Sequence, residues 1–232
     1  MGHEPASTPE VGDVARKAAV KVWGTWVGLP LFFLGAGGSL GWWQAWVYCA
    51  LLLVPMTAFV TWMVRHDPVF LARRFTLREK EDRQRQILAW GAPFILATLI
   101  LPGLDHRFGW SEPPVTAVVA AMSLSLAGYL MVLRVFLENR WAGRTVETFS
   151  GQHVVSTGPY AVVRHPMYAG IIVLLLATPV ALGSWWALMP ALGYIPFIVL
   201  RMRNEEEVLL RELPGYEEYR RRVRHRLLPF LW

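Results

Sequence analysis

Long apolar runs alternate with short charged segments along the whole chain. No Asp, Glu, Lys, Arg or His occurs in four stretches, residues 22–64, 86–104, 113–133 and 166–200. A helix that crosses the hydrocarbon core of a membrane needs about 20 apolar residues. The first and last stretches are long enough for two helices each, and the middle two for one each. The pattern therefore predicts six membrane-spanning helices.

Glycine and serine residues divide the two longest stretches. A turn at Gly37, Gly38 and Ser39 separates the first two helices, and one at Gly183 and Ser184 separates the last two. The expected spans cover about residues 22–38, 42–64, 87–104 and 114–137, with the last two inside 166–200. We therefore predict an all-α polytopic membrane protein. We expect an N-terminal part with four helices, residues 1–137, and a C-terminal catalytic part with two helices and a charged tail, residues 138–232.

The composition agrees with this fold class. Hydrophobic residues make up 54% of the chain and charged residues only 17%, whereas soluble domains carry about 25% charged residues. The single cysteine, Cys49, excludes a disulfide framework or a cysteine-based metal site within one chain. We expect no metal site.

Basic residues lie almost entirely on one side of the predicted membrane. Of the 23 Lys and Arg residues, 22 occur in the N-terminal arm, residues 65–86, residues 134–165 and the tail, and Arg107 is the exception. The positive-inside rule then places these segments and both termini in the cytoplasm. The net charge of +6 is thus a topology signal that also suits an anionic lipid surface. No nucleic-acid partner is expected.

The first unusual polar block is STGPYAVVRHPMYAG, residues 156–170. Pro166 favours an extended residue before it and suits the first turn of a helix. A helix start beside Arg164 and His165 suits a bound anion, and tyrosine rings on either side suit an adenine ring or a cation. The alternative interpretation is an ordinary helix start with interfacial Arg and Tyr side chains.

The second block follows the last span and reads RMRNEEEVLLRELPGYEEYRRRVRHR. Arg203 and Glu207 are four residues apart and share a helix face, as do Arg201 and Glu205. Ionisable residues at a membrane boundary are often functional, although a solvated helix with ion pairs is the alternative. Because the last two helices form a hairpin, we expect the two blocks to be neighbours.

Together the two blocks resemble the isoprenylcysteine carboxyl methyltransferase and phospholipid methyltransferase superfamily of integral membrane enzymes. The resemblance covers about the last 80 residues, and the first four helices carry no matching motif. It implies that the C-terminal part binds S-adenosylmethionine, with S-adenosylhomocysteine as the product. It implies an acceptor-orienting role for Arg203 and a catalytic and cofactor-contacting role for Glu207. The other implied cofactor-binding residues are Gln152, His153, Val154, Val155, Tyr160, Arg164, His165, Pro166, Met167 and Tyr168. The family often has histidine at the position of Gln152, whereas in this chain the histidine is one residue later, at position 153.

The expected activity is methyl transfer to a lipophilic or lipidated acceptor that enters from the bilayer at the cytoplasmic face. The acceptor group stays open between carboxylate, amine, phenol and thiol. We expect a monomer in contact with membrane lipids, in a bacterial inner membrane. Two alternatives remain, a sterol-reductase-like membrane enzyme that uses NADPH, and a non-enzymatic membrane protein of the same fold.

Overall fold

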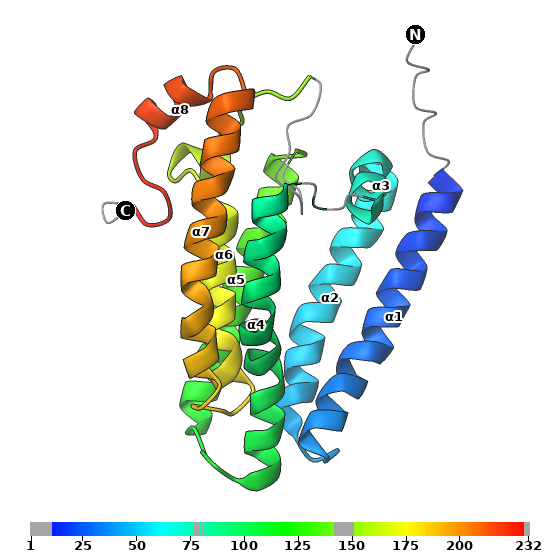
Figure 1. The fold of residues 1–232 in the computed structure, drawn as a ribbon. Coiled ribbons are helices and arrows are strands. Elements are labelled where there is room, and N and C mark those ends of the chain that lie inside the picture. Colours follow the sequence, from blue (N-terminus) through cyan, green and yellow to red (C-terminus); the bar gives the residue numbers. More distant parts are fainter. Residues whose placement is uncertain (1–10, 77–78, 80, 142–150, 230–232) are drawn as a thin grey trace.

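A computed structural model describes residues 11–76, 79, 81–141 and 151–229 of the 232-residue chain, and all regular secondary structure among them is helical (Figure 1). Six longer helices run roughly side by side. The short elements α3, η1 and α8 lie at one end of this bundle (Figure 1). The elements are α1 (Val11–Gly37), α2 (Trp43–His66), α3 (Pro68–Thr76), α4 (Asp82–Phe108), α5 (Val115–Glu138), η1 (Gly158–Ala161), α6 (Pro166–Ala181), α7 (Leu188–Glu212) and α8 (Tyr216–Arg222).

The predicted all-α membrane fold is confirmed. Helices α1, α2, α4 and α5 are each long and apolar enough to cross a membrane. Helix α6 is apolar but has only 16 residues, and α7 is free of charge only as far as Leu200. The expected turns after Gly37 and around Gly183 separate the helices as predicted. The termini, residues 1–10 and 230–232, lie outside the described residues, so their expected side stays a prediction.

Helices α1 and α4 begin well before the predicted apolar runs. Helix α1 begins at Val11 and α4 at Asp82, so both contain polar turns that the charge-free stretches did not include. In α1 these turns are supported by ion pairs from Asp13 to Arg16 and Lys17, three and four residues away. Helix α3 was not predicted, because nine residues with three polar side chains leave no membrane-length signal.

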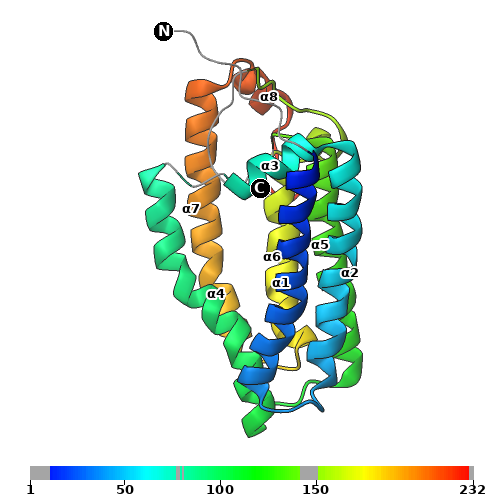
Figure 2. The same cartoon turned by 90° about the vertical axis from the view of Figure 1, so that its right-hand side faces the viewer.

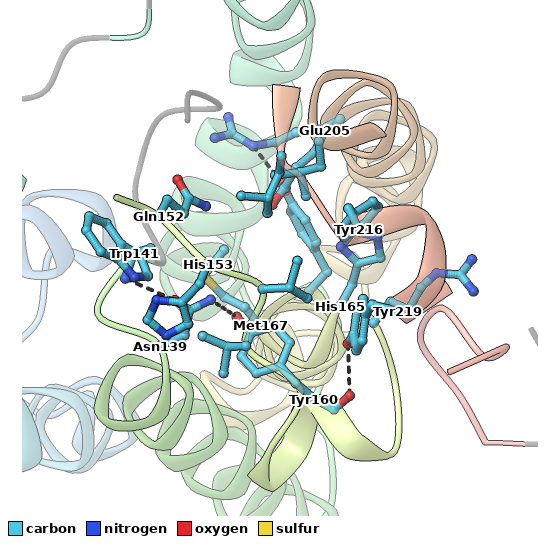
Figure 3. A pocket seen from close by; sticks show the side chains of 17 residues that line it. Asn139, Trp141, Gln152, His153, Tyr160, His165, Met167, Glu205, Tyr216 and Tyr219 are labelled. Atoms are coloured by element: carbon cyan, nitrogen blue, oxygen red, sulfur yellow. Dashed lines mark hydrogen bonds between the residues drawn. The ribbon is translucent and has the colours of Figure 1, made fainter. Parts of the chain in front are cut away.

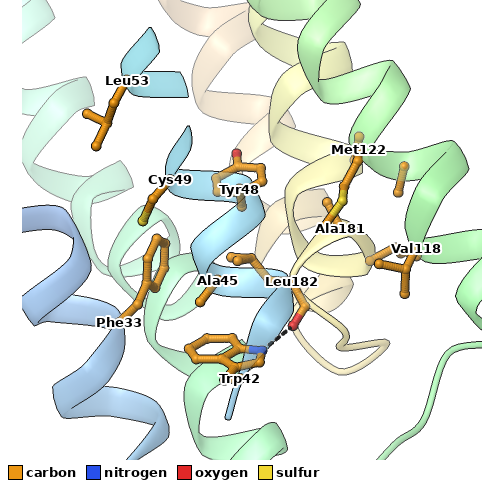
Figure 4. Packing of buried hydrophobic residues seen from close by; sticks show 13 residues of the cluster. Phe33, Trp42, Ala45, Tyr48, Cys49, Leu53, Val118, Met122, Ala181 and Leu182 are labelled. Carbon is orange, nitrogen blue, oxygen red and sulfur yellow. Dashed lines mark hydrogen bonds between the residues drawn. The ribbon is translucent and has the colours of Figure 1, made fainter. Parts of the chain in front are cut away.

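The end of the bundle opposite α8 holds a packed apolar core (Figure 4). Its members come from α1, α2, α5 and α6, and include Phe33, Tyr48 and Leu182. The indole of Trp42 is buried among them and donates a hydrogen bond to the Leu182 carbonyl, 3.1 Å away (Figure 4). The core therefore joins the first hairpin to the C-terminal end of α6.

A buried carboxylate fixes the same end of α4. Asp105 is fully buried and accepts hydrogen bonds from the Ser111 backbone and hydroxyl at 2.7 and 2.6 Å, and from the Ser184 hydroxyl. Since Ser184 lies in the turn between α6 and α7, Asp105 holds this hairpin against α4. Helix α4 packs along α7, and the C-terminal end of α4 contacts the C-terminal end of α1 (Figure 2).

Helices α5 and α6 approach each other at two glycines. A Cβ atom on Gly128 would lie 2.7 Å from the Gly170 carbonyl oxygen, and one on Gly170 would lie 2.8 Å from the Gly128 carbonyl oxygen. Small residues allow this close backbone approach in membrane helices. The contact holds the first half of α6 against the middle of α5, and the start of α6 and the end of α5 carry residues of the candidate site.

We predict that Gly128→Ala destabilises the protein by about 1–3 kcal/mol, because the added methyl group forces two helix backbones apart. Gly28→Ala on α1 is the control, since no atom lies within 4 Å of a Cβ at that position. Equilibrium unfolding in mixed detergent micelles measures both. Equal stability of the two variants would show that the close approach does not contribute.

Candidate functional site

A cavity lies at the end of the bundle where α5 ends and α6 begins (Figure 3). Its empty space, open mouth included, is about 770 Å³. Its walls come from the end of α5, the segment before α6, the polar part of α7, and α8. The lining residues are Asn139, Trp141, Gln152, His153, Val154, Val155, Tyr160, Arg164, His165, Met167, Tyr168, Arg201, Glu205, Leu209, Leu213, Tyr216 and Tyr219.

The structure brings most of the sequence-predicted residues together at this cavity. The segment 152–155 forms one wall, with both Gln152 and His153 among the lining residues. Helix α6 begins at Pro166 as predicted, and His165 is its N-cap residue. Pro166 is buried and does not line the cavity. The other lining residues predicted from the sequence are Val154, Val155, Tyr160, Arg164, Met167 and Tyr168.

The structure does not bring Arg203 and Glu207 to the cavity. Both are exposed, and the Glu207 carboxylate pairs with Arg83 of α4 at 2.7 Å. A helix turns by about 100° per residue, and here the residues two positions earlier, Arg201 and Glu205, face the cavity. The α7 residues that face this cavity thus lie two positions before the expected ones, and the roles expected for Arg203 and Glu207 stay a prediction. The sequence spacing could not decide which pair faces the cavity, because Arg201 and Glu205 are four residues apart, as are Arg203 and Glu207.

A row of polar groups joins α6 to α7 along one wall. The Tyr168 hydroxyl donates to Glu205 Oε2 at 2.7 Å, and Arg201 Nε donates to the same hydroxyl oxygen at 3.1 Å. A second carboxylate, that of Glu79, lies 3.8 Å from Arg201. Of these groups, the Arg201 guanidinium and the Glu205 carboxylate line the cavity, next to the apolar part of the bundle.

Next to this wall, Glu206 forms a buried ion cluster. Its Oε1 atom accepts a hydrogen bond from Arg164 Nε at 2.7 Å and lies 3.1 Å from His165 Nε2, while Oε2 accepts from Arg226 Nε at 3.0 Å. Burial raises the pKa of Glu206, but the hydrogen bonds and charges of His165 and Arg164 outweigh burial and lower it to about 2. Because folding lowers this pKa from its ordinary value of 4.5, the charged carboxylate stabilises the folded protein when the pH is above 4.5. This stabilisation is lost as the pH falls from 4.5 towards 2.

The same residues attach the C-terminal segment to the start of α6. The backbone amides of Arg164 and His165 donate to the carbonyls of His225 and Arg226, both at 2.9 Å. The Arg164 guanidinium also donates to the carbonyls of Val223 and Arg224. The polar groups of Arg164 and His165 are therefore directed at protein partners, which differs from the anion-binding role that the sequence suggested for them.

Aromatic side chains form the remaining wall. Tyr160 accepts a hydrogen bond from Asn139 at 3.1 Å through its hydroxyl, and its carbonyl accepts from the Tyr219 hydroxyl at 2.8 Å. Burial raises the pKa of Tyr160 well above its usual value and that of Tyr219 to about 12, so both phenols stay protonated at neutral pH. The Tyr216 hydroxyl is buried in the wall and has no hydrogen-bond partner among the described residues. A buried polar atom of this kind is suited to a bound ligand.

Several lining residues were not predicted from the sequence. Tyr216 and Tyr219 are three residues apart and both lie on the buried face of α8, a spacing that could have indicated them. Asn139 and Trp141 follow the end of α5 and carry no local signal, because only the tertiary fold brings them beside residues 152–155. Among the described residues, no group of three or more His, Cys, Asp and Glu side chains could hold a metal ion.

The region that builds this cavity is similar in sequence to known proteins. Residues 116–215 match the family model described as phospholipid methyltransferase, and all lining residues except Tyr216 and Tyr219 lie within that match. The chain is also 30% identical over 134 residues to the nickel-cobalt-cadmium resistance protein NccN of Alcaligenes xylosoxydans xylosoxydans. That similarity covers 56% of this chain and 59% of the relative, so the chain spans little more than half of the relative's length. The matched region forms α5, α6 and most of α7, and this match supports a relationship of the chain to the membrane methyltransferase superfamily.

Proposed function

We propose that the protein is an integral membrane methyltransferase that uses S-adenosylmethionine and methylates a lipophilic acceptor entering from the bilayer. The match of residues 116–215 to the phospholipid methyltransferase family model supports the reaction class. The observation that carries the proposal is the placement of Arg201 and Glu205 on the cavity wall beside the apolar part of the bundle. A water-soluble cofactor and a membrane-borne acceptor can meet at such a boundary.

The residues present fit S-adenosylmethionine, whose groups are an adenine, a ribose, a sulfonium cation, an amino group and a carboxylate. The rings of Trp141, Tyr160 and Tyr219 offer flat faces for the adenine and for the cation. Glu205 offers a carboxylate for a positively charged group. The Tyr216 hydroxyl, for which the described residues provide no partner, offers a hydrogen bond. When bound, the cofactor supplies an electrophilic methyl group.

The chain's own residues would orient the acceptor and handle its proton. Arg201 would hold an acceptor carboxylate or phosphate by charge-assisted hydrogen bonds, and a carboxylate acceptor needs no general base. An amine, phenol or thiol acceptor must lose a proton, and Glu205 would accept it. Tyr168, which is hydrogen-bonded to both side chains, would keep them in place. The acceptor class therefore decides which residue acts on it. An isoprenylcysteine-type carboxylate would be held by Arg201, and another lipid that must lose a proton would use Glu205.

We predict that Glu205→Gln weakens binding of S-adenosylmethionine about tenfold, because a hydrogen bond to a charged group contributes about 1.5–3 kcal/mol. Glu207→Gln is the matched control, since it removes the same charge two residues away on the exposed face. Calorimetric titration of the purified full chain measures both, with NADPH titrated in parallel. Equal affinities of the two variants would contradict the assignment of Glu205, and tight binding of NADPH alone would contradict the proposed activity.

We predict that Arg201→Gln keeps cofactor affinity within about threefold but lowers turnover at least about 100-fold, because the guanidinium contacts the acceptor rather than the cofactor. Arg203→Gln, on the exposed face of the same helix, should keep both properties. Turnover is followed as transfer of radiolabelled methyl groups into a membrane lipid extract. A variant at position 201 that turns over like the variant at 203 would rule out this role.

A further inference from the structure

A second hollow lies outside the cavity, against the C-terminal segment. Of the residues that the structure describes, only arginines line it, and we call it the arginine hollow. Its members are Arg164, Arg220, Arg221, Arg224 and Arg226. The hollow is wide and open to the surroundings, with about 1020 Å³ of empty space. It is separate from the acceptor wall, although Arg164 borders both spaces.

The arginine hollow carries more positive charge than its partners neutralise. Arg164 and Arg226 share the single carboxylate of Glu206. Arg220 and Arg221 share that of Glu217, at 3.4 and 3.2 Å. The exposed Arg224 side chain has no carboxylate within 4.0 Å among the described residues. Among the described residues, five guanidinium groups therefore face two carboxylates, so positive charge exceeds negative charge there.

The hollow lies at the depth where the apolar part of the bundle ends. Arg164 stands two residues before Pro166, the first residue of α6. After α8 the chain turns back along α7 (Figure 1), and Leu227 is buried in the cluster that contains Ile198 and Met202 of that helix. The next residue, Leu228, is 54% exposed. An arginine cluster followed by an exposed leucine thus lies at the boundary between the polar segments and the membrane spans.

We propose that the arginine hollow binds the phosphate group of an anionic phospholipid in the leaflet on this side of the membrane, with Leu228 against its acyl chain. Guanidinium groups match phosphate oxygens in pairs, and anionic leaflets attract basic segments next to membrane spans. A lipid fits better than a free phosphate because the hollow includes Arg164, two residues before the apolar helix α6, and because the exposed Leu228 follows Arg226 by two residues. The lipid would offset the charge surplus and hold the C-terminal segment on the membrane. This binding does not depend on methyl transfer.

The test measures lipid binding by the purified full chain in detergent micelles. The probes are short-chain phosphatidylglycerol, short-chain phosphatidylcholine and inorganic phosphate. The variant Arg220→Gln, Arg221→Gln, Arg224→Gln is compared with the control Lys17→Gln, Arg85→Gln, Arg211→Gln, which removes three exposed basic groups, each paired with a nearby acid elsewhere on the chain. Native mass spectrometry or thermophoresis gives the affinities. Arg164 and Arg226 stay unchanged because they hold Glu206.

We expect phosphatidylglycerol to bind the wild type and the control equally, and the triple variant at least tenfold more weakly, since each arginine near a lipid surface contributes about fivefold. Arg224→Gln alone breaks no ion pair of the described residues, and should weaken binding about fivefold even if the triple variant does not fold. Added salt should weaken wild-type binding. Three results would overturn the proposal: equal affinity for phosphatidylcholine, competition by inorganic phosphate at a similar concentration, or equal losses in the triple variant and the control.

Discussion

The candidate site depends on one buried carboxylate, that of Glu206. It joins three segments that are far apart in the sequence: the start of α6 through Arg164 and His165, α7 through its own backbone, and the C-terminal segment through Arg226. Removing one partner from a buried ion pair typically costs several kcal/mol, because an uncompensated charge remains out of water. The cluster therefore holds the three segments in one arrangement, and this arrangement shapes the cavity.

The same contact explains why three consecutive glutamates have three different environments. Once Glu206 faces the protein interior, the helical turn directs Glu205 to the cavity wall and Glu207 to the surface, where it pairs with Arg83. The register of α7 is thus set by the one carboxylate that finds buried cationic partners. Arg201, one turn before Glu205, faces the same cavity.

The sequence predicted the all-α membrane fold and singled out most of the residues between Gln152 and Tyr168 that line the cavity, because charge-free runs and a local motif are both readable along the chain. It did not predict the α7 register, since the pairs 201/205 and 203/207 have the same spacing and only tertiary burial distinguishes them. It also assigned Arg164 and His165 to a bound anion, whereas they contact Glu206 and the C-terminal segment. The contributions of Trp141, Tyr216 and Tyr219 arise from chain segments that only folding brings beside the motif.

The most direct measurement is hydrogen exchange of the segment 219–227 in Glu206→Gln, with the protein in lipid nanodiscs. Glu217→Gln serves as the control, because it removes an exposed carboxylate whose partners, Arg220 and Arg221, lie on the same short helix. The account predicts that the Glu206 variant loses protection across this segment and binds S-adenosylmethionine more weakly, while the control keeps both. Unchanged protection and affinity in Glu206→Gln would contradict the claim that this carboxylate holds the site together.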